Sequence, residues 1–389
     1  MSATGNGDDD LDATIQGHLS RISDLLEQVR FRSALDAAGE VARLGKREGR
    51  LIPHMLGLFH AMDLSKDVLE PEKSREFAVQ LIALLEDPER ARSVQGDFPE
   101  EEYLNAVATM TTCAYDNLAE ATARLEGYNS AGMQQCLAEG IQICHRTGRP
   151  ACVNCFRNYA AEVHTAADDI PLAVHHATMI LNHQGEWSGR GDCRPDAAMS
   201  LARLHLLLGD LGAADRFLAA ADEASRGEEV VMKLQATIRL DTDREALALL
   251  ADESPPAAPA GRPLPAGENP VFDLHWALCD ALRHCRNSDY AAAKDVLTHW
   301  DRLLTERACL SDWFEVRLRL IAAHRLAGDE RRVETLSNQL QAKAKKAGDY
   351  LTLRRLRRLI DPTEPVCPVP LLAAPRVGPY APAGVAVPD

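Results

Sequence analysis

Apolar residues recur at spacings of three and four positions along nearly the whole chain. Leu201, Leu204, Leu208 and Leu211 form one such series, and strict alternation of apolar and polar residues is almost absent. Spacings of three and four place side chains on one face of an α-helix, whereas alternation marks a strand. The pattern therefore predicts an all-α protein whose helices are about 12–18 residues long.

Four breaks between the predicted helices share one arrangement. Their second positions are residues 168, 209, 288 and 328, so successive breaks are 41, 79 and 40 residues apart. A histidine stands four positions before each of them: His164, His205, His284 and His324. The interval of 79 residues leaves room for a further unit around residues 240–250. Self-similarity at this period predicts a solenoid of stacked repeats.

Each repeat is expected to be a pair of antiparallel helices joined by a short turn. Gly209-Asp210 and Ser288-Asp289 have the residue types that make such a turn and cap the second helix. Small residues on both helices, such as Ala202 and Ala214, let the two backbones approach closely. A single pair cannot bury its apolar face, so the pairs are expected to stack, with the histidines in packing positions.

These repeats resemble the tetratricopeptide family. The unit Ala202…Gly209-Asp210-Leu211…Ala214…Ala221 fits the family pattern best, and similar units begin at Ala161 and Ala281. The period exceeds the family's usual length of about 34 residues and is closer to long-helix variants such as those of kinesin light chains. Histidine here replaces the family's aromatic residue near the end of the first helix. The resemblance implies a right-handed superhelix with a concave groove that binds a partner peptide or helix.

The same pattern divides the chain into four parts. Residues 1–10 are predicted to be disordered, residues 11–146 to form divergent helical pairs, and residues 147–360 to form tetratricopeptide-like repeats with a proline-rich loop at 254–270. Residues 361–389 are rich in Pro and Ala and are predicted to be a disordered tail. We therefore predict an α-solenoid of about eight antiparallel helix pairs, with Tyr350–Ile360 as a C-terminal capping helix.

Composition narrows the class of protein. The 389 residues carry a formal net charge of −15 and only 5% are aromatic, which disfavours a β-sandwich or barrel. No apolar run approaches the roughly 18 residues of a membrane span, and the acidic start MSATGNGDDD has no secretory signal. We expect a cytoplasmic protein without membrane contact. Its acidic balance disfavours nucleic acid as a partner.

Two sets of residues are candidate contacts for a partner. Residues 301–360 contain 14 Lys and Arg against 8 Asp and Glu, a net charge of +6 in an otherwise acidic chain. The basic cluster there is Lys343, Lys345, Lys346, Arg354, Arg355, Arg357 and Arg358. It suits an acidic protein or peptide, although a solvated capping helix would show the same charge. The resemblance implies a second set, on the first helix of the 151–184 unit: Asn154, Arg157 and Asn158.

Ten cysteines are present, and one group of them has the composition of a metal site. Cys144, His145, Cys152 and Cys155 fall where one predicted helix ends and the next begins. Three thiolates and an imidazole can hold zinc tetrahedrally, with His183 or Cys193 as the alternative fourth ligand. A single CxxC is a weaker indication than a pair of them, and packing of small side chains or reactive redox thiols are the competing interpretations. No other cofactor is indicated.

The sequence contains none of the HExxH, GxSxG, GxGxxG or GxxxxGK[ST] motifs that mark common catalytic and nucleotide-binding sites. We therefore expect no enzymatic activity and no catalytic residues. The leading hypothesis is a scaffold or adaptor that binds a partner peptide or helix in its concave groove. The alternatives are a ligand- or peptide-sensing regulator and a zinc-stabilised helical protein centred on residues 144–155.

Overall fold

The structure is a computed structural model that describes residues 5–87, 100–149, 152–183, 193–227 and 267–361, with residues 240, 241, 243, 244 and 247. Within these ranges every regular element is a helix and no strand is present, so the all-α prediction is confirmed. None of the described helices combines the length and the hydropathy that crossing a bilayer requires.

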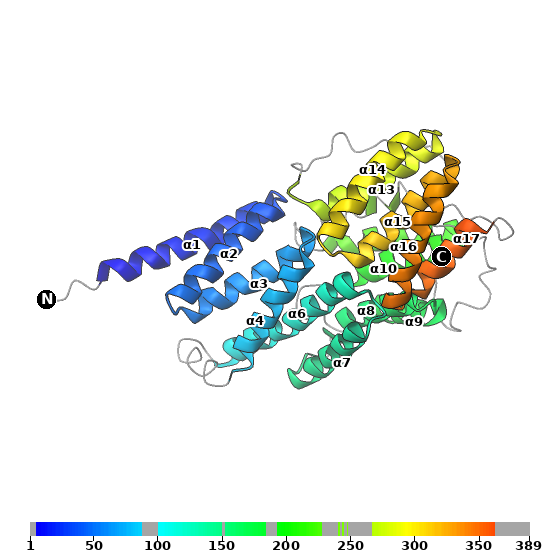
Figure 1. The fold of residues 1–389 in the computed structure, drawn as a ribbon. Coiled ribbons are helices and arrows are strands. Elements are labelled where there is room, and N and C mark those ends of the chain that lie inside the picture. The colour runs from blue at the N-terminus through cyan, green and yellow to red at the C-terminus, as the bar shows by residue number, and fades with distance from the viewer. Residues whose placement is uncertain are drawn as a thin grey trace.

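The helices follow one another as antiparallel hairpins (Figure 1). The first five hairpins are α1 (Gly5–Glu27) with α2 (Phe31–Arg47), α3 (Leu51–Asp67) with α4 (Pro71–Leu85), α6 (Glu100–Glu126) with α7 (Ala131–Arg146), α8 (Val153–Ala166) with α9 (Ile170–Leu181), and α10 (Arg194–Leu208) with α11 (Leu211–Ala224). After residue 266 come α13 (Pro270–Arg286) with α14 (Tyr290–Glu306), α15 (Leu310–Leu326) with α16 (Glu330–Ala347), and the single helix α17 (Tyr350–Ile360).

Helix α17 spans the residues predicted for the C-terminal capping helix. At the N-terminus α1 starts at Gly5, inside the segment 1–10 that the sequence suggested was disordered. The unit expected around residues 240–250 and the tail at 362–389 lie largely or wholly outside the described residues. The number of pairs and the handedness of the superhelix therefore stay predictions.

The repeated histidine and aspartate belong to a single kind of turn. Asp168, Gly209, Ser288 and Gly328 take left-handed φ values of 64°, 76°, 59° and 76°. The next residue, always Asp, donates its N–H to the carbonyl oxygen of the histidine, as in Asp210 to His205 at 2.9 Å. This is the Schellman arrangement, which satisfies a carbonyl group that the end of the helix would leave unpaired.

The same aspartate caps the following helix. The Asp210 carboxylate accepts the N–H of Ala213 at 3.0 Å, and the equivalent residues Asp169, Asp289 and Asp329 make the same bond. The His205 Nδ1 lies 3.6 Å from the Asp210 carboxylate, and its ring stacks on Phe217 at 5.2 Å between centroids. The histidine and aspartate that mark each repeat in the sequence are therefore the residues that form its turn.

The helices are arranged in two layers. Helix α3 contacts α6, α6 contacts α8, and α8 contacts α10, while α13 contacts α15 and α15 contacts α17. These helices form one layer, which places their hairpin partners in the other. The C-terminal half also returns to the N-terminal half, because α15 contacts α6 and α17 contacts α8 (Figure 1). One hydrophobic core joins both ends, with Phe31 and Phe272 6.1 Å apart between ring centroids.

We call the contact between the two halves the seam. It joins the turns at residues 29–31, 68–69, 127–129 and 168 to residues 267–272, 307–312 and 347–354. Asn269 is 1% exposed, and its amide accepts the Phe31 N–H at 3.4 Å and donates to the Val29 carbonyl oxygen. Arg307 donates to the Val68 carbonyl oxygen at 2.6 Å. Residues 267–269 of the predicted proline-rich loop thus contact the N-terminal half of the chain. Residues 254–266 of that loop lie outside the described ranges.

Candidate functional site

Helix α8 carries the candidate site on the face that bears Asn154, Arg157 and Asn158, which we call the α8 face. Their spacing of three and four residues places them together. Asn154 is 1% exposed, and its Oδ1 accepts a hydrogen bond from Arg157 Nη1 at 2.7 Å. A guanidinium group can only donate, so this bond fixes the orientation of the Asn154 amide.

The fixed orientation leaves the Asn154 Nδ2 buried without a hydrogen-bond partner among the described residues. The Asn158 Oδ1, one helical turn further along, is buried and unpartnered in the same sense. Buried polar groups in folded proteins are nearly always paired, because an unpaired one costs about 1–3 kcal/mol. The α8 face therefore contains one buried amide donor and one buried amide acceptor that these residues leave unpaired.

The structure brings the second predicted set close to α8, since α17 packs against this helix. Arg354 Nη2 lies 2.7 Å from the carboxylate of Asp168, the residue that forms the turn between α8 and α9. Arg355 reaches Glu315 through two contacts of 2.7 and 3.3 Å and is only 11% exposed. These two arginines therefore bind acidic groups of their own chain.

The other members of the basic cluster differ in their exposure. Lys345, Lys346 and Arg357 are exposed, and Arg358 is partly exposed. Lys343 lies over the ring of Trp313, with its Nζ 4.1 Å from the ring centroid. Arg357 is thus the exposed member of the predicted partner-binding set on α17.

Burial and ion pairing set the charge states around α17. Burial alone would raise the pKa of Glu315, but the attraction of Arg355 and Arg319 outweighs it and lowers that pKa below its usual range. Asp349 caps α17 through a 2.8 Å bond from the Thr352 N–H. Burial raises the pKa of the Asp349 carboxyl to about 6, because the hydrogen bonds from Thr352 offset only part of the cost of desolvation.

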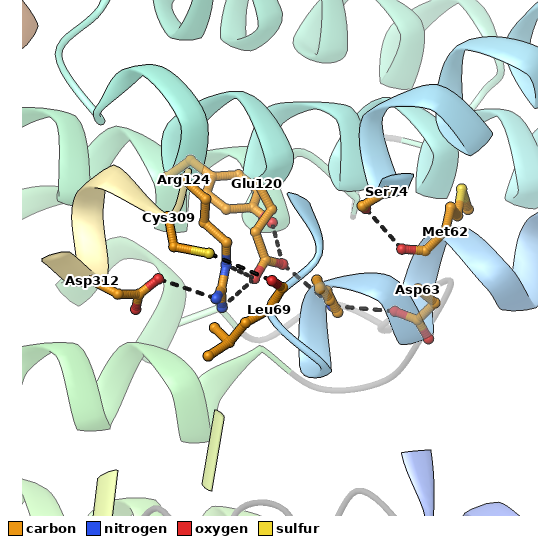
Figure 2. A network of polar contacts seen from close by, with 10 residues as sticks. Met62, Asp63, Leu69, Ser74, Glu120, Arg124, Cys309 and Asp312 are labelled. Carbon is orange, nitrogen blue, oxygen red and sulfur yellow. Dashed lines mark hydrogen bonds and ion pairs between the residues drawn. The ribbon is translucent and has the colours of Figure 1, made fainter. Parts of the chain in front are cut away.

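A partly buried network of charged side chains connects the two halves of the chain (Figure 2). Lys66 of α3 lies 3.3 Å from Glu120 of α6, and Arg124 lies 3.1 Å from Glu120 and 3.2 Å from Asp312 of α15. Arg124 is 11% exposed; burial would lower its pKa, but Asp312 and Glu120 outweigh burial and raise it. In the sequence only the spacing of Glu120 and Arg124 hints at this network, because the other partners come from distant helices.

The cysteines predicted to bind zinc gather where α7, α8 and α10 begin or end. Cys144 and Cys152 are 0% and 5% exposed, whereas Cys155 and Cys193 are partly exposed and lie 3.5 Å apart between Sγ atoms. Burial, reinforced by the thiols of Cys152 and Cys155, raises the pKa of the Cys144 thiol to about 12.

The histidines proposed for the zinc site lie in different surroundings. His145 is exposed on the last turn of α7, and His183, partly exposed, follows α9. Across the described part of the chain, no three His, Cys, Asp or Glu side chains are placed to hold a metal ion together. Zinc binding by the 144–155 cluster stays a prediction.

No protein-family model matches the sequence, and no curated protein has significant similarity to it. The functional argument therefore depends on the residues of this structure.

Proposed function

We propose that the protein is an interaction scaffold whose α8 face binds an extended segment of a partner protein. The observation that carries the proposal is the buried Nδ2 of Asn154, which has no partner among the described residues although Arg157 fixes its direction. A peptide backbone presents alternating carbonyl and N–H groups. Both atoms are buried in the free chain, so the bound segment would displace the side chains that cover them. Asn154 would then donate to a backbone carbonyl, and Asn158 would accept a backbone N–H.

Charge supports a partner segment with an acidic side chain or carboxylate. Arg157 stands between the two asparagines and is partly exposed. Helix α17 contacts α8, and its exposed Arg357 adds positive charge. Charged hydrogen bonds to a carboxylate are stronger than neutral ones and would fix the direction of the bound segment.

The arrangement of helices also supports a scaffold. A two-layer array of hairpins presents side chains from several helices along one surface, and extended binding surfaces are the usual product of such arrays. Here the C-terminal half packs on α6 and α8 and covers part of their surface. The surface left for a partner is therefore smaller than in a solenoid whose two ends do not touch. The resemblance to tetratricopeptide repeats and the right-handed superhelix belong to this proposal.

A peptide-display selection against the full chain tests the proposal. Selected peptides should be measured by calorimetry on the wild type, on Asn154→Asp and on Asn338→Asp. Asn154→Asp keeps the side-chain shape and the Arg157 contact but removes the amide donor. Asn338 is exposed on α16 and serves as the matched control.

We expect Asn154→Asp to weaken binding at least tenfold, which corresponds to about 1.4 kcal/mol, and Asn338→Asp to leave it unchanged. Thermal unfolding of all three proteins checks that each is folded. Peptides that bind Asn154→Asp as tightly as the wild type would show that the α8 face is not the binding site.

A further inference from the structure

Two cysteines face each other beside the α8 face. Cys155 is on α8, directly after Asn154, and Cys193 immediately precedes α10. Their Sγ atoms are 3.5 Å apart, and α8 and α10 are in contact. A disulfide bond is about 2.05 Å long, so closing the gap requires a movement of about 1.5 Å. Small side-chain rotations of the two residues can supply that movement.

Exposure separates this pair from the other cysteines nearby. Cys155 and Cys193 are both partly exposed, whereas Cys144 and Cys152 are 0% and 5% exposed. Oxidation of thiols follows their accessibility, and a second thiol within reach converts an oxidised cysteine into a disulfide. A small oxidant from solvent therefore reaches the pair whose sulfur atoms already point at each other.

We propose that Cys155 and Cys193 form a redox pair that a hydroperoxide converts into a reversible disulfide. The thiolate of one cysteine attacks a peroxide oxygen, the O–O bond breaks, and hydroxide leaves with the electron pair, which gives a sulfenic acid. The thiolate of the second cysteine attacks that sulfur, the S–S bond forms, and the S–O bond breaks. With two protons from the thiols, hydrogen peroxide is reduced to two waters and the two thiols are oxidised by two electrons.

The disulfide would join α8 to the start of α10, next to Asn154. It would fix two consecutive helices of one layer relative to each other and close the chain between residues 155 and 193 into a loop. A thiol-based reductant would reverse the reaction by exchange. The inference does not depend on peptide binding, because the linkage can be detected in the protein alone.

Peptide mapping of the full-length chain tests the proposal. The reduced protein is treated with a few equivalents of hydrogen peroxide, its remaining thiols are blocked, and it is digested without reductant for mass spectrometry. We expect a peptide that links Cys155 to Cys193, and thiols counted in denaturant should fall from the ten in the sequence by two. Dithiothreitol should restore the count.

Variants and metal analysis make the outcome decisive. Cys155→Ser and Cys193→Ser should each abolish the link and leave a sulfenic acid on the remaining cysteine, detected with dimedone. Cys285→Ser, which removes another partly exposed cysteine on α13, should leave the link intact. A disulfide that joins other cysteines instead, or no disulfide at all, would overturn the proposal. So would one equivalent of bound zinc that both serine variants lose, since the thiols would then be metal ligands.

Discussion

The guanidinium group of Arg354 lies 2.7 Å from the carboxylate of Asp168 and thereby joins the last helix to the turn between α8 and α9. Asp168 takes a left-handed φ of 64°, which Asp tolerates better than most residues. The ion pair lies at one end of the seam, where the C-terminal half of the chain meets the N-terminal half. The order of the hairpins along the chain does not reveal this contact.

This ion pair should contribute a measurable but small coupling to stability. Both side chains are partly exposed, at 27% for Arg354 and 22% for Asp168. Burial raises the pKa of Asp168, and the attraction of Arg354 offsets only part of that effect. We expect the double-mutant cycle of Asp168→Asn and Arg354→Gln, measured by urea unfolding at pH 7, to give a coupling of about 0.5–1 kcal/mol. Strictly additive single mutants would show that the pair does not contribute to the seam.

Arg124 should contribute much more to the free energy of unfolding than an exposed arginine does. Replacing Arg124 with Met removes the positive partner of Glu120 and of Asp312 in a partly buried network. Leaving buried carboxylates without a partner costs about 3–5 kcal/mol, and Lys66, which also binds Glu120, should hold the loss near the lower value. The measurement is the free energy of unfolding in urea.

The matched control for Arg124 is Arg302→Met. Arg302 pairs with Glu306 on the surface of α14, where the two side chains are 72% and 62% exposed. We expect this substitution to change stability by less than about 0.5 kcal/mol. A similar cost for both variants would mean that the network of Figure 2 is not a stabilising link between the two halves.

Alanine substitution at two glycines on neighbouring helices should change the stability of the protein in opposite directions. A methyl group on Gly57 of α3 would collide with the backbone of Ala42 on α2, so these helices approach too closely for a side chain. Gly57→Ala should therefore destabilise by about 1–3 kcal/mol. Gly39 on α2 has open space around its Cα, and Gly39→Ala should stabilise by up to about 1 kcal/mol, because Ala is the better helix former. The measurement is the midpoint temperature of thermal unfolding of each variant. If both substitutions shift this midpoint in the same direction, the close packing of α2 on α3 is contradicted.

The carboxyl of Asp349 should make stability depend on pH. Its folded pKa of about 6 lies above the unfolded value of about 3.9. The folded state thus holds the proton more tightly, and the contribution of this group to stability is complete below about pH 4 and is lost as the pH rises through 6. Asp349→Asn keeps the capping oxygen without the charge. We expect the variant to be more stable than the wild type at pH 7, by at most about 3 kcal/mol.

Urea unfolding of both proteins between pH 4 and 7 checks this expectation. The difference in stability between variant and wild type should shrink as the pH falls and become small near pH 4, where the folded wild type, like the variant, is neutral at position 349. A difference that stays constant over this range would show that the carboxyl does not titrate between the folded and unfolded values given above.

Local patterns along the chain were sufficient for the helices and for the turns between them. The spacing of Leu201, Leu204 and Leu208 predicts one helical face, and His205 with Asp210 marks a turn whose hydrogen bonds the structure shows. These features are readable because each depends on residues within a few positions of one another. The candidate residues on α8 were proposed as a set from the resemblance to tetratricopeptide repeats, and their role as partner contacts stays a prediction.

The contacts between distant segments could not be predicted from local patterns in the sequence. Nothing near Arg355 in the sequence shows that its charge is bound by Glu315, and nothing near Asn269 shows that its amide meets Phe31. The basic cluster was predicted as one accessible surface, but part of it pairs with acidic groups of the same chain. Cys193 was an alternative zinc ligand, and the structure places its thiol against that of Cys155.

Helix periodicity and turn chemistry are local properties, so the order of residues is enough to identify a chain of helical hairpins. That the hairpins return upon themselves through the seam, and which charges and thiols meet as a result, is visible only in the folded chain. Small rotations between successive repeats add up along such an array. The direction in which its far end points therefore depends on the packing of all of them together.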